Sequence, residues 1–189
     1  MIVDAHHHFW DPTRREYPWM TEELAAIRRP FGPGELRPLL EDNGVDRTVL
    51  VQALSSLDET RELLDTAATS EFVAGVVGWV DLTSPDVTDT LASLVSDLLV
   101  GIRHQVHDEP DPGWLLRDDV QRGIAAVGEA GLVYDLLVRT RELPAALKTV
   151  RRQKDVSLLL RQFLGHPDAA DEPTLIAAHR NNPGSQTSD

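Results

Sequence analysis

Three consecutive histidines stand near the start of the sequence, in the run Asp4-Ala5-His6-His7-His8. In a strand, successive side chains point to opposite faces, so His6 and His8 would share one face and His7 would take the other. Two imidazoles at positions i and i+2 can reach one divalent ion, and zinc and its neighbours favour such nitrogen ligands. The spacing therefore predicts that His6 and His8 could bind a metal, with zinc or manganese as candidates.

An expression tag or a chance placement in the core would also explain adjacent histidines. A tag is disfavoured because the run is only three residues long, lies inside a strand pattern and follows Asp4. An H-x-H match is a weak motif by itself. The choice between these interpretations therefore depends on the elements around the run.

A second polar cluster follows a later apolar run, in the segment G-I-R-H-Q-V-H-D-E-P at residues 101–110. Arg103 could hold a carboxylate or a polarised carbonyl through its planar fork of N–H donors. His104 or His107 could carry a proton near neutral pH. The alternative is a solvated polar loop with one structural ion pair, and the sequence favours neither interpretation over the other.

Three further side chains are candidates for substrate binding. Gln52 ends one apolar run, Tyr134 interrupts another, and Trp19 falls in the proline- and arginine-rich segment 11–34. A polar residue at a strand end is more often a satisfied hydrogen-bonding group than a ligand contact. Tryptophan more often packs in a loop or core, although its amphipathic ring also suits a binding site.

Short runs rich in β-branched residues alternate with longer helical patterns along the chain. The runs are nearly continuous in apolar residues, which indicates strands that are covered on both faces in a parallel sheet. We expect strands at residues 2–3, 48–52, 73–80, 99–102, 132–138 and 156–160.

Helix signals separate these runs. The spacing of Ser56 and Glu59 is that of a capping box, and Ser84-Pro85 resembles an N-cap followed by proline at the first helical position. Gly44 and Gly131 can end helices in the left-handed conformation. We expect helices at residues 35–43, 56–68, 84–97, 118–130 and 142–152.

The alternation of strands and helices predicts βαβ units with right-handed crossovers. A doubly wound sheet and a β/α barrel both fit this pattern. No G-x-G-x-x-G segment follows the first strand, which disfavours a dinucleotide-binding fold. In a barrel, reactive groups lie at the carboxyl ends of the strands, where His6, His8 and Arg103 would meet.

Composition bounds the class of protein. Of the 189 residues, 41% are hydrophobic, which is typical of an ordinary globular domain. The formal net charge of −13 argues against nucleic acid or an anionic membrane as a partner. Cysteine is absent, so a metal would have to bind imidazole and carboxylate. The start resembles no signal peptide, and we expect a cytoplasmic protein.

Several motifs together resemble a known family. D-A-H-H-H-F-W-D at residues 4–11, Y-P-W-M at 17–20, V-Q-A at 51–53, G-W-V-D at 78–81, the segment 101–110 and L-V-Y-D-L-L-V at 132–138 occur in order along the chain. They are similar to the amidohydrolase superfamily, in the branch that includes L-fuconolactonase- and L-rhamnono-lactonase-like enzymes.

The resemblance implies a (β/α)8 barrel of the TIM type and hydrolysis of a sugar lactone or a related cyclic ester. It implies that His6 and His8 form a metal-binding or substrate-orienting pair, and that Arg103 and His104 contact substrate. Metal dependence differs within the branch, and only two of the usual ligand groups remain in this sequence, so we expect a divalent metal that is weakly bound or absent. The expected partner is a small sugar lactone.

The sequence departs from the family pattern near its end. Gln162 and Phe163 stand where relatives carry an Asp-His pair, and a complete barrel needs roughly 250 residues. We therefore expect an incomplete barrel of about six parallel strands at residues 1–160 and a divergent polar tail at 161–189. The open edges could be covered by the tail or by a second copy in a homodimer.

Two functions remain open from the sequence. The first is a lactone hydrolase in which an activated water attacks the carbonyl. The second is a catalytically impaired remnant of such an enzyme, which binds a ligand or partner without turnover.

Overall fold

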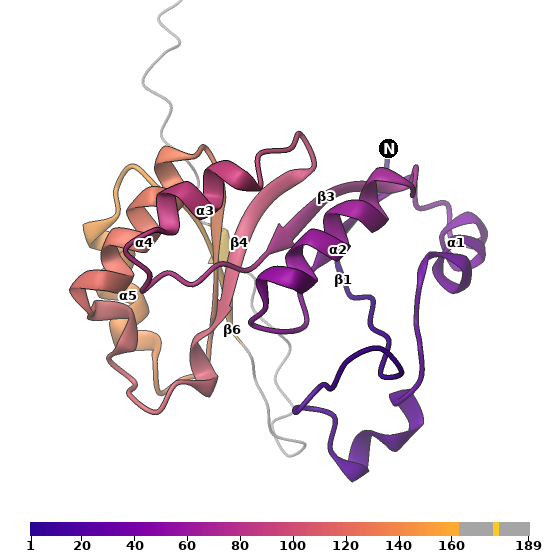
Figure 1. Ribbon diagram of the computed structural model, residues 1–189, viewed down its shortest axis with the longest axis horizontal. Coiled ribbons are helices and arrows are strands. Elements are labelled where there is room, and N and C mark those ends of the chain that lie inside the picture. The colour runs from indigo at the N-terminus through magenta and orange to yellow at the C-terminus, as the bar shows by residue number, and fades with distance from the viewer. Residues whose placement is uncertain (163–175, 178–189) are drawn as a thin grey trace, which may run out of the picture.

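A parallel sheet of six strands forms the centre of the molecule, and Figure 1 shows the computed structural model, which describes residues 1–162 and 176–177. Each strand pairs in parallel with the strand before it in the sequence. This consecutive order is that of a β/α barrel, whereas a doubly wound sheet reverses at a switch point. The strands are β1 (Val3–His7), β2 (Arg47–Val51), β3 (Val73–Gly78), β4 (Leu99–Gln105), β5 (Val133–Val138) and β6 (Ser157–Gln162).

Helices cover the outer side of the curled sheet (Figure 1). One apolar cluster joins β4 and β5 to α3, α4 and α5, and a second joins β2 and β3 to α1 and α2. The expectation of a TIM-type barrel with about six parallel strands is confirmed. The helices are α1 (Pro33–Asp42), α2 (Leu57–Ala68), α3 (Val87–Ser93), α4 (Asp118–Glu129) and α5 (Leu143–Arg152), with 3₁₀ turns η1 (Glu22–Ile27), η2 (Val106–Asp108) and η3 (Trp114–Leu116).

Local sequence signals explain several helix ends. Gly44 and Gly131 follow α1 and α4 with φ values of 65° and 76°, a region that favours glycine. The Ser56 hydroxyl accepts a hydrogen bond from the Glu59 N–H at 3.2 Å and caps α2. Pro144 lies in the first turn of α5, where its missing N–H costs nothing. The predicted ends of these helices are confirmed.

The helix expected at residues 84–97 is shorter in the structure, where α3 spans Val87–Ser93. Residues before it form a turn, because the Asp81 carboxylate accepts from the N–H and hydroxyl of Thr83 at 2.9 and 2.6 Å. The Ser84 N–H in turn binds the Asp81 carbonyl at 3.2 Å. This local pairing competes with helix formation and delays the first helical turn. The Ser84-Pro85 start was therefore a wrong prediction.

The two edges of the sheet differ. A short strand, β7 (Ile176–Ala177), pairs antiparallel with β6, so a piece of the predicted tail covers this edge, and β6 itself continues two residues past the expected boundary at 160. At the other edge, β1 pairs with β2 alone among the described strands. The expected homodimer, which could cover this edge, stays a prediction. Phe163 and the rest of the tail at 163–175 and 178–189 lie outside the described residues.

The segment between β1 and α1 folds back onto itself. The backbones of Trp10 and Phe31 pair in an isolated antiparallel bridge, with N···O distances of 3.2 and 2.9 Å. Tyr17, Met20 and Ala53 form a small buried cluster against which Trp10 and Trp19 pack. The long first loop is thereby fixed beside the end of β2. In the part of the chain that is described, no helix has the length and apolar character to cross a membrane.

Candidate active site

His6 and His8 converge at the carboxyl end of β1. Their Nε2 atoms lie 2.9 Å apart, and their rings meet edge to face with centroids 4.7 Å apart. His7 turns the other way and binds the Thr48 hydroxyl through Nε2 at 2.8 Å, on the helix side of the sheet. The alternation predicted from the sequence therefore holds for these three side chains.

The hydrogen bonds restrict the protonation of the two rings. His8 Nδ1 lies 2.8 Å from the Val51 carbonyl oxygen, which can only accept, so Nδ1 carries the proton and a neutral His8 presents a lone pair at Nε2. The two Nε2 atoms repel each other unless a proton on His6 or a cation lies between them. The pair is thus arranged either to share a proton or to bind a cation.

Arg103 reaches the same place from β4. Its Nη1 lies 3.4 Å from His6 Nε2, and its Nη2 donates to the backbone carbonyl and the side-chain oxygen of Gln52, the latter at 3.3 Å. Both Arg103 and Gln52 are buried. The structure therefore brings His6, His8, Gln52 and Arg103 together, although Arg103 lies 97 residues after His6 in the sequence.

The loop after β2 is fixed by several side chains. Gln52 Nε2 donates to Gln105 Oε1 at 3.2 Å, and Gln105 Nε2 donates to the Ala53 carbonyl at 3.2 Å. Trp19 donates its indole N–H to the same carbonyl at 3.0 Å. Trp19 thus lies next to the end of β2, and its indole N–H already has a partner in the protein. Gln105 falls within the segment 101–110, in which the sequence predicted roles for Arg103, His104 and His107.

His104 lies on the opposite face of β4 from Arg103. The Trp79 indole N–H donates to its Nδ1 at 2.9 Å, its Nε2 donates to the Glu109 carboxylate at 2.7 Å, and the ring stacks on Trp114 at 4.3 Å. Burial lowers the pKa of His104, and the Glu109 carboxylate opposes this. Both ring nitrogens of His104 thus have protein partners on the face of β4 away from His6 and Arg103, and the expected contact of His104 with substrate stays a prediction.

His107 lies in η2, directly after β4. Its Nε2 is 3.3 Å from the Asp108 carboxylate, and the side chain is largely buried. Burial lowers the pKa of His107, the Asp108 charge raises it, and the positive charges of Arg139 and Arg103 lower it further. A histidine that is neutral at neutral pH suits proton transfer better than one that is permanently charged.

Tyr134 is fully buried within the apolar cluster between the sheet and the helices. Burial raises the pKa of its hydroxyl far above the ordinary value. The Tyr134 side chain therefore lies on the helix side of β5, and the expected binding of substrate by Tyr134 stays a prediction. Its neighbour Asp135 pairs in register with Arg103 and takes the other face of β5. The sequence alone did not single out Asp135 over Tyr134.

The residues fit part of a metal site. His6 and His8 direct two imidazole nitrogens at one point, as two metal ligands would. Among residues 1–162 and 176–177, no group of three or more His, Asp or Glu side chains is placed to hold a metal ion. The Arg103 guanidinium also lies close to the same point. The described side chains therefore account for two of the ligands that a zinc ion needs.

Glu59 is a buried carboxylate that the sequence did not single out for function. The capping box predicted that its side chain returns to the Ser56 N–H, but Glu59 Oε2 instead accepts from the N–H groups of Ala53 and Leu54 at 3.0 and 2.8 Å. Burial raises its pKa to about 7. The Ser56–Glu59 spacing gave no signal of this role, because it is equally typical of an ordinary helix start.

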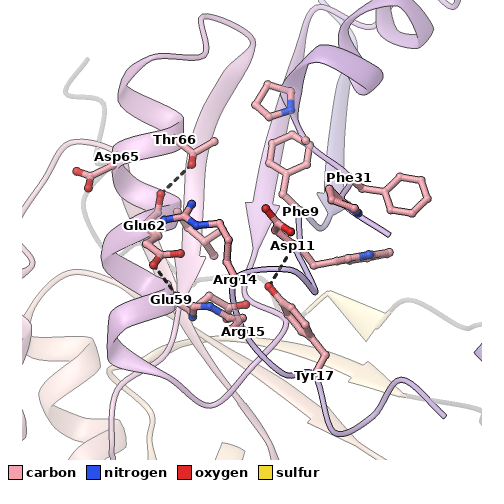
Figure 2. Close-up of a pocket in the computed structure, with 15 residues that line it drawn as sticks. Phe9, Asp11, Arg14, Arg15, Tyr17, Phe31, Glu59, Glu62, Asp65 and Thr66 are labelled. Atoms are coloured by element: carbon pink, nitrogen blue, oxygen red, sulfur yellow. Dashed lines mark hydrogen bonds and ion pairs between the residues drawn. The ribbon is translucent and has the colours of Figure 1, made fainter. Parts of the chain in front are cut away.

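A separate cavity of about 410 Å³ lies between the first loop and α2, as Figure 2 shows. Arg15 pairs with Glu62 across it at 2.6 Å, and the Tyr17 hydroxyl accepts from the Asp11 N–H at 3.2 Å. Neither His6, His8, Gln52 nor Arg103 lines this cavity. It is therefore distinct from the cluster at the strand ends, and Glu59 lies between the two.

Consecutive parallel strands with polar side chains gathered at their carboxyl ends define the class of β/α barrels. The amidohydrolase family model matches residues 3–181. The chain belongs to the amidohydrolase family. The resemblance seen in the sequence is thereby confirmed.

Two relatives share the sequence over most of this chain. L-fucono-1,5-lactonase from Burkholderia ambifaria is 43% identical over 187 residues, which cover 95% of this chain and 64% of the relative. L-fucono-1,5-lactonase from Burkholderia multivorans is 34% identical over 170 residues, which cover 89% of this chain and 57% of the relative. The chain thus matches less than two thirds of the length of each relative.

Solved structures agree with the fold. A crystal structure of an amidohydrolase from Burkholderia multivorans with bound zinc has a TM-score of 0.80 and 34% identity, and covers 85% of this chain and 57% of that chain. Amidohydrolase 2 from Bifidobacterium longum subsp. infantis has a TM-score of 0.67 at 24% identity, over 90% of this chain and 64% of that chain, which supports the fold alone.

Proposed function

We propose that this protein hydrolyses a sugar lactone at the cluster formed by His6, His8 and Arg103. The observation that carries the proposal is the meeting of three side chains from two strands, with Arg103 Nη1 3.4 Å from His6 Nε2 and His6 Nε2 2.9 Å from His8 Nε2. The names of the two lactonase relatives support a 1,5-lactone of a sugar as the substrate class.

Lactone hydrolysis requires attack of water on the carbonyl carbon, followed by release of the ring oxygen. Negative charge develops on the carbonyl oxygen when water attacks, and the Arg103 guanidinium stabilises it. The attacking water must give up a proton and the leaving ring oxygen must gain one. His107 is our candidate for both transfers, because burial keeps its imidazole neutral and able to accept the proton of the water, and the imidazolium so formed can donate it to the leaving oxygen. Gln52 holds Arg103 in place through its carbonyl and side-chain oxygens, and Trp19 borders the same loop.

His6 and His8 would orient the substrate or bind a divalent metal between their Nε2 atoms. A metal held there would lower the pKa of a bound water toward neutrality. The bound zinc in the amidohydrolase from Burkholderia multivorans supports a metal for this family. We propose that binding in this chain is weak, because the described residues supply two ligands.

The test is a hydrolysis assay with a panel of aldonolactones, made on protein that near-UV circular dichroism shows to be folded. We expect turnover of at least one 1,5-lactone, and loss of that turnover in the Arg103→Ala variant. A folded wild-type chain that binds lactones or aldonates without hydrolysing them would instead support the impaired remnant. Loss of turnover in His6→Ala as well would locate the activity at the proposed cluster.

A further inference from the structure

Glu59 stands out because its carboxylate is buried and serves a loop instead of its own helix. Its side chain is on the first turn of α2 and the residue is only 3% exposed. Oε2 accepts from the backbone N–H groups of Ala53 and Leu54, while Oε1 is buried and has no hydrogen-bond partner in the described part of the chain. The helix does not need this carboxylate, because the Ser56 hydroxyl already caps it.

The two N–H groups belong to the loop on which the proposed site depends. Ala53 directly follows Gln52, whose carbonyl and side-chain oxygens accept from Arg103. The Ala53 carbonyl accepts from Trp19 and Gln105 at 3.0 and 3.2 Å. Both the N–H groups and the carbonyl of this loop are therefore hydrogen-bonded. Glu59 accepts from the N–H groups, and the side chains of Trp19 and Gln105 donate to the carbonyl of Ala53.

Burying a carboxylate is costly unless hydrogen bonds or opposite charges compensate for the lost water. Burial is the main reason that the pKa of Glu59 lies near 7, and the two backbone N–H groups, Arg15 and Arg103 all act to lower it. Arg15 comes from the first loop and is itself paired with Glu62 of α2, as Figure 2 shows. No side-chain cation forms a salt bridge with Glu59 within the described residues. The loop N–H groups are therefore its main stabilising partners.

We propose that Glu59 is a positioning residue, whose carboxylate fixes the loop after β2 so that Gln52 holds Arg103 in its working orientation. This inference rests on the proposed function, because Arg103 is the group it positions. Glu59 itself does not touch the substrate. Its effect on the reaction passes through the backbone of Ala53 and Gln52.

Three variants test the proposal by steady-state kinetics. Glu59→Ala removes the acceptor and should lower kcat/KM about 10- to 100-fold, mainly through kcat, because small displacements of a reacting group cost that much. Glu59→Gln keeps an acceptor oxygen for both N–H groups and should stay within about fivefold of wild type. Leu63→Ala is the matched control, since Leu63 is buried on the same helix but packs in the apolar cluster.

We expect the Leu63 variant to be less stable than wild type yet to keep kcat/KM within about threefold while folded. The proposal is overturned if Glu59→Ala keeps wild-type kcat/KM, if Glu59→Gln is as slow as Glu59→Ala, or if Leu63→Ala loses as much activity. The pH profile gives a further readout. In wild type kcat/KM should rise by no more than about fivefold through pH 7 as Glu59 ionises, because a carboxylate accepts the two N–H bonds more strongly than a neutral oxygen does, and Glu59→Gln should lack this step.

A second measurement does not depend on activity. Amide hydrogen exchange at Ala53 and Leu54 should be at least tenfold faster in Glu59→Ala, while amides in the later turns of α2 exchange as in wild type. If wild type does not hydrolyse lactones, the proposed function fails but this exchange result still tests the placement of the loop. Unchanged exchange at both amides would overturn the inference whatever the activity.

Discussion

Gln52, at the end of β2, and Arg103, on β4, form reciprocal hydrogen bonds across β3. The Gln52 side-chain N–H donates to the Arg103 carbonyl at 3.2 Å, while the Arg103 guanidinium donates to the Gln52 carbonyl and to its side-chain oxygen. Both residues are buried, so each bond is made where water cannot replace it. This reciprocal contact fixes the guanidinium next to His6.

Removing the Gln52 side chain should therefore release Arg103. We expect Gln52→Ala to lower kcat/KM about tenfold and to cost about 1–3 kcal/mol of stability, because buried partners lose their hydrogen bonds. Steady-state kinetics and urea unfolding measure the two effects. Gln121→Ala is the control, since the partly buried Gln121 side chain also makes amide hydrogen bonds, to the Leu115 carbonyl and the Thr149 hydroxyl, but remote from the cluster. A control variant with the same loss of kcat/KM would contradict the role of Gln52.

Glu59 should make stability depend on pH. Its pKa rises from 4.5 in the unfolded chain to about 7 in the folded protein. The folded state therefore binds this proton more tightly than the unfolded state does. The contribution of Glu59 to the free energy of unfolding is fully present below pH 4.5 and is lost as the pH rises through 7. The loss amounts to about 3 kcal/mol. We expect urea unfolding of Glu59→Gln to lack this component, and identical pH dependence in both proteins would contradict it.

His104 should act in the opposite direction. Burial lowers its folded pKa below 6.5, so the unfolded state binds the proton more tightly. Its contribution to stability is present above pH 6.5 and is lost as pH falls through the folded pKa. Comparison of wild type with His104→Gln by urea unfolding between pH 5 and pH 8 isolates this component. A difference in unfolding free energy that stays constant over this range would be incompatible with the lowered pKa.

Metal binding should be weak if His6 and His8 are the main ligands. We expect extensive dialysis against metal-free buffer to leave far less than one equivalent of zinc or manganese per chain by elemental analysis. Added zinc should bind wild type more tightly than His6→Ala, because one of two converging nitrogens is then missing. A full equivalent of metal retained after dialysis would show that further ligands complete the site.

Much of the fold could be predicted from the sequence because its signals are local. The β-branched runs mark the strands, and Ser56, Gly44 and Gly131 mark helix ends. The start of α3 could not be predicted. From the sequence, Asp81 could either simply end a strand or accept hydrogen bonds that form a turn, and the structure shows the turn. Short-range pattern alone does not rank such alternatives.

The site was predictable only in part, for a similar reason. Strand alternation placed His6 and His8 on one face, and the polar segment 101–110, together with the family resemblance, pointed to Arg103. The same alternation puts His104 and Tyr134 on the helix side of the sheet, which became clear only when the register of β4 and β5 was known. Glu59 was missed because its partners, Ala53 and Leu54, are backbone groups and leave no trace in side-chain chemistry.

The most direct measurement of the central claim is hydrolysis of aldonolactones by wild type and Arg103→Ala, on samples matched for near-UV dichroism. The account predicts measurable turnover of a sugar 1,5-lactone by wild type and a loss of at least about 100-fold when the guanidinium is removed. Arg61→Ala, which removes an exposed guanidinium on α2, should keep full activity. Equal turnover by wild type and Arg103→Ala would contradict the proposed site.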